Sequence, residues 1–264
     1  MKNTFWDKNK RTICNLGLVA VIFAIMVTIQ YTAEPTSMWF SVLRKVCTFT
    51  LAAVSMNLLN GFTGLFSLGQ AGFMLLGAYT YAVFTIPTDM RHTVYRNYGD
   101  SLITFQLPLV VGLILAGLVA AFFAWLIGLP VLRLKSDYLA IATLGFAEIV
   151  RGIVQLQDFG PVTNGPDPIN SFTAPKSILV YAAIAGVCIF IIVLLINSTY
   201  GRAFKAIRDD EVAAEAMGIN LAHHKRLSFI ISSFFCGIAG AMLAMCNSAV
   251  SSVSFTAAMT YQIL

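Results

Sequence analysis

The sequence predicts an all-α, polytopic transmembrane helical bundle of about six to eight spans, and its composition is the first observation behind this. Hydrophobic residues make up 58% of the 264 residues and charged residues only 11%, and the mean hydropathy is +0.79. A soluble domain carries about 25% charged residues. Because so little charge cannot cover a water-facing surface, most of the chain must face lipid. We expect a single transmembrane domain over residues 1–264.

Stretches without charge are the second observation, because a charged side chain at mid-bilayer costs about 2.5–3.5 kcal/mol. The first span is predicted at 13–31, as an uncleaved helix after a basic N-terminus. Residues 46–86 carry no charge over about twice the length of one span, so the chain must fold back near 60–64. The other predicted spans are 105–132, 138–156, 178–196 and 227–246.

The distribution of Lys and Arg is the third observation, and it predicts a cytoplasmic N-terminus. The inner segments would then be 1–12, 60–64, 133–137 and 197–226, and they carry about twice as many Lys and Arg residues as the outer segments. Arg44 and Lys45 are exceptions, since they fall on the outer side. The chain ends at Leu264 in an apolar segment rich in Ser and Thr, and we expect the natural protein to continue with a further span.

Polar side chains gather inside the long uncharged stretch. Groups that can hydrogen-bond need partners there, because lipid offers none. Neighbouring glycines permit close packing or a break in the helix, and a broken helix frees N–H and C=O groups that can hold a zwitterion. The segment therefore predicts either a substrate route or close helix packing with interhelical hydrogen bonds. The candidate route residues are Asn57, Asn60, Thr63, Ser67 and Gln70.

Glu148 and Arg151 are charged residues within a predicted span. They are three residues apart, so they share a helix face and can form an ion pair. Charged residues inside a membrane indicate a functional site by default. We add both to the candidate route, while a self-neutralised structural pair, or a pair with a partner subunit, explains them equally well.

Segment 197–226 is too long and too rich in helix-forming residues for a simple connection. Its residues predict a short amphipathic helix that ends in a turn at Gly218. A cytoplasmic helix of this kind suits docking into a groove on a partner protein, and a solvated linker is the alternative.

Ala213-Ala214-x-x-x-Gly218 resembles the loop of ABC importer permeases that contacts the ATPase subunit. The acid usual in that motif would fall at Val212, whereas Glu211 lies one place earlier. Longer blocks sharpen the resemblance: NGFTGLFSLGQAGF at 60–73 and LRLKSDYLAIATLGFAEIVR at 132–151. From about residue 46 onward, the chain resembles the LivM-type permeases of branched-chain amino acid uptake systems.

This resemblance implies a permease subunit of an ATP-driven importer that moves Leu, Ile and Val across the bacterial inner membrane. Its implied partners are two ABC ATPase subunits, a second related permease, an extracytoplasmic substrate-binding protein and the lipid bilayer. Contacts with the ATPase are expected from Arg208, Glu211, Ala213, Ala214 and Gly218. ATP hydrolysis would take place on the partner subunits, so no catalytic residue, metal or cofactor is expected in this chain.

Other functions fit less well. Related permeases import urea or short amides, and the sequence does not separate these substrates from branched-chain amino acids. An ion-coupled transporter would need buried acids in inverted repeats, and an intramembrane enzyme would need facing Asp, His or Cys groups. No GxxxxGK[ST] motif, CxxC pair or dense basic run occurs, which argues against an ATPase site, a metal site and nucleic-acid binding.

Overall fold

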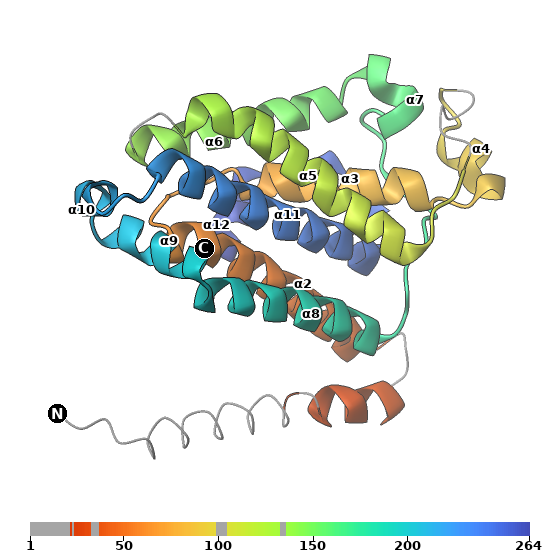
Figure 1. Cartoon of the computed structure of the whole chain (residues 1–264). Coiled ribbons are helices and arrows are strands. Elements are labelled where there is room, and N and C mark those ends of the chain that lie inside the picture. The colour runs from red at the N-terminus through yellow and green to blue at the C-terminus, as the bar shows by residue number, and fades with distance from the viewer. Residues whose placement is uncertain (1–21, 23, 33–36, 99–104, 133–135) are drawn as a thin grey trace.

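A computed structural model describes residues 22, 24–32, 37–98, 105–132 and 136–264, and it is almost entirely helical (Figure 1). The long helices are α2 (Met38–Asn57), α3 (Gln70–Thr85), α5 (Leu109–Val131), α6 (Ser136–Val154), α8 (Ile178–Asn197) and α11 (Leu221–Asn247). The short helices are α4 (Arg91–Val94), α7 (Gly160–Thr163), α9 (Thr199–Asp209), α10 (Glu211–Ala216) and α12 (Ala257–Ile263). A π-helical segment, η1 (Leu58–Phe62), follows α2, and the 3-10 turns are η2 (Thr88–Met90), η3 (Gln157–Phe159) and η4 (Ser252–Ser254). Strands β1 (Ile169–Asn170) and β2 (Ala249–Val250) pair antiparallel, with Ile169 opposite Val250.

The predicted helical membrane bundle is confirmed. Among the described residues, four helices are long and apolar enough to cross a membrane. Two helix pairs, bent by 101° and 65°, raise the number to six if each pair is one span. The predicted first span at 13–31 lies mostly outside the described residues. In this region the structure describes residues 22 and 24–32, which are helical.

Helix α11 begins at Leu221, six residues before the predicted span, and the reason is its cap. The Asn220 side chain accepts a hydrogen bond from the His223 backbone N–H at 3.0 Å, which satisfies a donor of the first turn. The charges of Lys225 and Arg226 therefore lie within the helix, near its start. Absence of charge marks the membrane-embedded part of a helix, whereas its end is set by capping.

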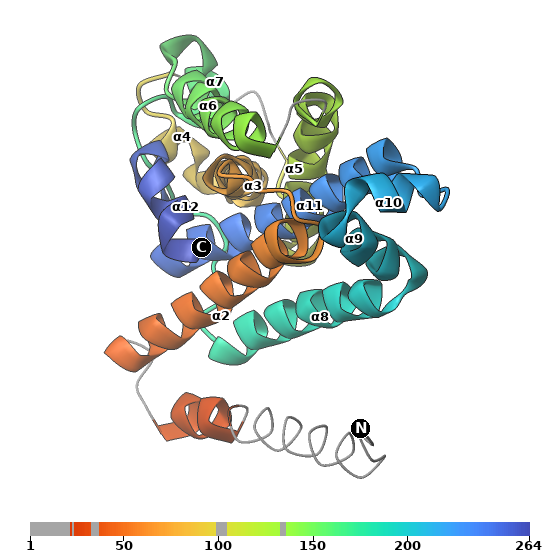
Figure 2. The same ribbon diagram turned by 90° about the vertical axis from the view of Figure 1, so that its left-hand side faces the viewer.

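The bundle is built around α11, which packs against α2, α3 and α5 (Figure 2). Close approach depends on glycines, because a Cβ on Gly77 would overlap the backbone of Gly237, and one on Gly240 would overlap the backbone of Met74. The outer sides of α5 and α8 are apolar instead, with exposed Phe122, Trp125 and Phe190. These two helices therefore offer a surface suited to lipid.

Gly77→Val is expected to lower the stability of the bundle, because the added side chain must push α3 away from the α11 backbone. Overpacking of a core usually costs about 1–3 kcal/mol, and contact with backbone places this case at the upper end. Thermal unfolding of the detergent-solubilised protein would measure the effect. Gly152→Val is the matched control, since an added Cβ there meets no atom within 4 Å. Equal melting temperatures for the two variants would contradict the prediction.

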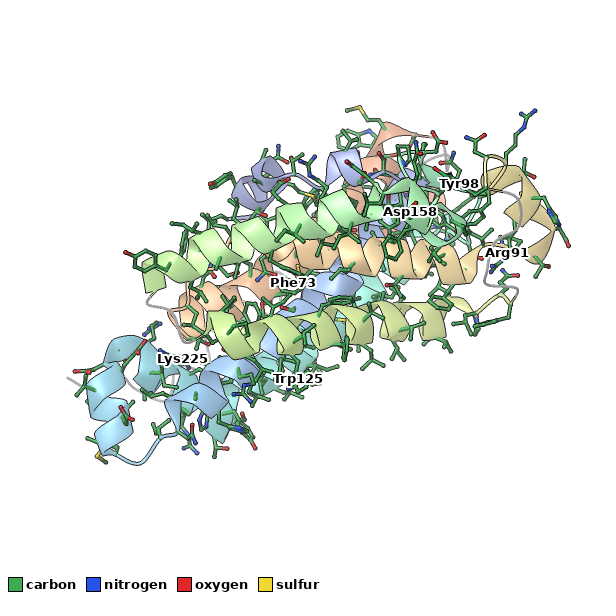
Figure 3. All side chains as sticks on the ribbon, turned by 90° about the horizontal axis from the view of Figure 1, so that it is seen from above. Phe73, Arg91, Tyr98, Trp125, Asp158 and Lys225 are labelled. Atoms are coloured by element: carbon green, nitrogen blue, oxygen red, sulfur yellow. The ribbon has the colours of Figure 1, made fainter. Side chains whose placement is uncertain are left out.

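The two ends of the bundle differ in character. Helices α9 and α10 lie at one end, and α4 and α7 at the other (Figure 1). Lys225 marks the first end, and Arg91, Tyr98 and Asp158 lie at the second (Figure 3). At the second end the Tyr95 hydroxyl donates to the Val162 carbonyl at 2.9 Å. Burial raises the pKa of Tyr95 to about 12, so this hydroxyl stays protonated and keeps its bond even at pH values near the ordinary pKa of tyrosine.

Candidate functional site

The uncharged stretch folds back through a break between α2 and α3. The π-helical turn η1 is followed by non-helical backbone at 63–69 before α3 begins at Gln70. The turn predicted near 60–64 is thus confirmed, and it extends five residues further. Side chains satisfy the freed N–H groups: Ser67 N–H donates to Asn60 Oδ1 at 3.2 Å, Leu68 N–H to Thr143 Oγ1 at 3.1 Å and Ala71 N–H to Thr260 Oγ1 at 3.2 Å.

Three of the polar residues predicted to line a route are buried within the chain. Thr63, Ser67 and Gln70 are each no more than 2% exposed. Thr63 Oγ1 donates to the Leu58 carbonyl at 3.1 Å, and Gln70 Nε2 donates to Ser232 Oγ at 3.4 Å. The first bond is local to η1, whereas the second joins α3 to α11, which is the geometry of interhelical packing.

Asn57 and Asn60 lie elsewhere, on the wall of an open cavity of about 450 Å³. The full lining is Thr50, Ala53, Val54, Met56, Asn57, Asn60, Ile263 and Leu264. The wall combines amide side chains with aliphatic ones. The structure thus brings two of the five predicted polar residues to a surface that a solute can reach.

A second cavity, of about 240 Å³, lies further toward the start of α2. It is lined by Lys45, Phe49, Leu243, Asn247, Ser254, Thr256, Ala258, Met259 and Gln262. Lys45, Phe49, Ala53 and Asn57 are spaced four residues apart, so one face of α2 lines both cavities, and residues of α12 line them too. We call this surface the α2/α12 face.

Lys45 gives the α2/α12 face a positive charge. In the described part of the chain, no carboxylate lies within ion-pair distance of its ammonium group. The sequence identified Lys45 only as an exception to the charge rule, and its place in a polar cavity depends on the packing of α11 and α12. In the sequence, the clearest signals for this site were Lys45 and the pair Asn57 and Asn60, which are three residues apart.

Glu148 and Arg151 form the predicted ion pair on α6, with 2.6 Å between Arg151 Nη2 and Glu148 Oε2. Both side chains are about one third exposed. Neither lines the two cavities of the α2/α12 face. Their geometry is that of a pair neutralised within one helix, and their place on a route stays a prediction.

Segment 197–226 is helical for most of its length. In α9, Phe204 and Ile207 are buried while the opposite side is polar, so the predicted amphipathic character is confirmed. The single helix predicted to end at Gly218 is wrong, because the extended backbone of Asp210 divides it into α9 and α10. Asp210 caps α10 by accepting hydrogen bonds from the N–H groups of Val212 and Ala213 at 2.8 and 3.1 Å. Gly218 has a φ of +85°, a left-handed turn that favours glycine, as predicted.

The exposed surface of α10 differs from the predicted one. Val212 and Met217 are 78% and 84% exposed, so two apolar side chains project from this end of the bundle. Ala214, which we expected on the docking face beside Ala213, is only 3% exposed and packs within its own chain. The reason is helical geometry: Ala214 lies about 100° around the helix from Ala213, on the side of α10 that packs within the chain, while Ala213 stays exposed.

Two other predicted coupling residues make contacts inside the chain. Glu211 forms an ion pair with Lys225 of α11 at 2.6 Å, which fastens α10 to the central helix. Arg208 reaches the break after α2, where its Nη1 donates to the Gly61 carbonyl at 3.1 Å. Among the described residues, no three His, Cys, Asp or Glu side chains gather closely enough to hold a metal ion.

Residues 38–264 match the family model described as the branched-chain amino acid transport system permease component. The chain is 32% identical over 242 residues to the high-affinity branched-chain amino acid transport system permease proteins LivM of Salmonella typhimurium and Escherichia coli. A probable branched-chain amino acid transport permease protein LivM from Methanocaldococcus jannaschii is 26% identical over 232 residues, and the match covers 66% of that relative's length. Each match covers 79% of this chain.

The chain spans about half the length of the two bacterial relatives, of which 52% is covered. No solved structure is significantly similar to it. The family match nevertheless covers the break after α2, both cavities of the α2/α12 face and the helices α9 and α10. The chain is a multi-pass membrane protein that belongs to the family of branched-chain amino acid transport permease components.

Proposed function

We propose that this chain is a permease subunit of an ATP-driven importer that carries branched-chain amino acids across the bacterial inner membrane. The observation that supports it most is the pair of exposed apolar side chains, Val212 and Met217, on a capped helix at one end of a bundle of this family. Such a helix suits the groove of an ATPase subunit. The other proposed partners are a second ATPase subunit, a second related permease and an extracytoplasmic binding protein.

The α2/α12 face is the proposed substrate route. Its exposed side chains include Lys45, Asn57 and Gln262, whereas the outer sides of α5 and α8 are apolar. Polar groups at membrane depth face a water-filled cavity or another protein rather than lipid. The second permease would therefore close this face from the opposite side, and the substrate would pass between the two subunits.

The cavity at Lys45 matches the chemistry of an α-amino acid. The ammonium group of Lys45 would bind the carboxylate, and the C-terminal end of α11 at Asn247, with its partial negative charge, would attract the substrate ammonium. Phe49, Leu243 and Met259 offer apolar contacts for an aliphatic side chain. Urea carries neither charge, so a lysine without an ion pair among the described residues favours an amino acid as substrate.

Uptake measurements test the function directly. The natural protein, reconstituted with its ATPases, second permease and binding protein, should accumulate leucine in vesicles when ATP is supplied. Urea and acetamide should compete weakly. Uptake of leucine driven by a proton or sodium gradient without ATP would contradict the proposal, as would preferential uptake of urea.

The proposed orientation places α9 and α10 in the cytoplasm, with the N-terminus on the same side. Single cysteines at Glu215 and Asp158 test this, because both residues are exposed. Glu215 belongs to α10 at one end of the bundle (Figure 1), and Asp158 lies at the other end (Figure 3). In a background without other cysteines, Asp158→Cys should react with an impermeant thiol reagent applied to intact cells. Glu215→Cys should react only after permeabilisation. The reverse pattern would place α10 outside and remove the basis for ATPase docking.

A further inference from the structure

Helix α9 is joined directly to the break after α2. Arg208 Nη1 donates to the Gly61 carbonyl at 3.1 Å, across 147 residues of sequence. The last carbonyls of a helix have no partner within it, so an arginine can satisfy one of them. The same guanidinium is held by Asp209, whose Oδ1 accepts from Nε at 3.1 Å and from Nη2 at 2.8 Å. The position of the Arg208 guanidinium is therefore fixed by the Gly61 carbonyl and by the Asp209 carboxylate.

Two further contacts tie α9 to the same place. Lys205 lies with its ammonium 5.6 Å from the centre of the Phe62 ring, within the range of a cation–π interaction. Gly64 has a φ of +76°, and a Cβ built on it would lie 3.0 Å from Arg208 Cγ and 3.3 Å from Arg208 Cα. Only a glycine lets the break approach α9 this closely.

The connection continues to the larger cavity. A Cβ on Gly61 would overlap Asn57 Oδ1, so the Asn57 side chain lies directly against this glycine. Asn57 in turn lines the cavity of about 450 Å³. A movement of α9 that pulls on the Gly61 carbonyl would therefore change the position of Asn57 through two contacts.

We propose that Arg208 is a positioning residue that transmits movement of the α9–α10 pair to the helix break and so controls access to the cavity at Asn57. Its guanidinium acts on the Gly61 carbonyl, while docking of the ATPase is carried by α10. This inference rests on the proposed function, since the ATPase supplies the movement. It separates two roles within the segment 197–226, which the sequence alone presents as one coupling element.

The test uses the natural protein reconstituted with its ATPases, with Ala53→Cys as a reporter on the cavity wall in a background without other cysteines. The labelling rate of this cysteine is measured without nucleotide and with a non-hydrolysable ATP analogue. In the protein that keeps Arg208, we expect the nucleotide analogue to change the labelling rate several-fold. Arg208→Gln should abolish this response while the ATPases remain bound. Arg202→Gln, an exposed arginine on the same helix, should keep it.

The possible results separate the role of Arg208 from the proposed function of the chain. A full nucleotide response in Arg208→Gln would overturn the role of Arg208 and leave the proposed function intact. Labelling that ignores nucleotide in every background, with no ATP-driven uptake, would overturn both. If Arg208→Gln fails to fold, Asp209→Asn replaces it, because Asp209 is 68% exposed and its carboxylate orients the guanidinium. That variant should weaken the response, and an unchanged response would count against the proposal.

Discussion

Replacing Val212 and Met217 together with Asp should abolish ATP-driven leucine uptake while the permease still folds and inserts. Both residues are more than three quarters exposed, so their replacement removes little internal contact. Burying a Val or Met side chain contributes about 1.5–3 kcal/mol, and a carboxylate left unpaired in the interface adds a desolvation cost. The combined loss corresponds to a decrease of more than about a hundredfold in ATPase affinity, since each tenfold step is about 1.4 kcal/mol.

A pull-down of the purified ATPase subunits measures this directly. The control is Val253→Asp, which places one such carboxylate on a valine that is 66% exposed in η4, outside α9 and α10. This control should bind the ATPases like the wild type. Ala214→Arg should behave differently from both, because Ala214 is buried within the chain and a bulky cation there should lower the melting temperature. ATPase binding that survives the double Asp variant would show that the contact lies elsewhere.

Lys45→Met should strongly reduce leucine uptake, with a higher KM rather than a loss of assembly. The variant removes the one cation among the described residues that line the cavity near the start of α2, and it keeps a similar length and an apolar stem. A hydrogen bond to a charged group contributes about 1.5–3 kcal/mol, which corresponds to roughly a ten- to hundredfold change in substrate affinity. Lys45→Arg keeps the charge and should recover part of the uptake.

The matched control for this prediction is Lys176→Met, an exposed lysine that lines neither cavity of the α2/α12 face. It should transport leucine with an ordinary KM. Uptake assays at varied leucine concentration, with binding protein and ATPases present, separate the two variants. An unchanged KM in Lys45→Met would mean that the ammonium group has another role, such as contact with lipid headgroups, and would remove the argument that separates an amino acid from urea.

Much of the fold follows from local chemistry, which a single sequence records. Long charge-free stretches predicted the helices, because lipid excludes charge and favours a backbone that satisfies itself. The turn at Gly218 followed from a glycine after a helix-forming run, and its φ of +85° agrees. The ion pair of Glu148 and Arg151 followed from their spacing of three, and it forms at 2.6 Å.

The candidate site could be predicted only in part, because the residues that share a surface are distant in sequence. Asn57 and Gln70 looked equivalent as polar groups in an uncharged stretch, yet Asn57 lines a cavity and Gln70 donates to Ser232 of α11. The difference arises because Asn57 ends α2 before the break, whereas Gln70 begins α3 after it, against α11. The pairing of β1 with β2 also escaped prediction, since strands of two residues have no periodicity to detect.

The sequence by itself determined that this chain is a helical membrane bundle with a further helical segment at 197–226, because those properties depend on hydropathy, spacing and capping along the chain. Only the tertiary structure decided which polar groups face an open cavity, that Ala214 faces inward while Val212 and Met217 face outward, and that Arg208 reaches Gly61. The physical reason is that contacts between α9 and the break, or between α2 and α12, depend on how glycine-rich helices pack around α11.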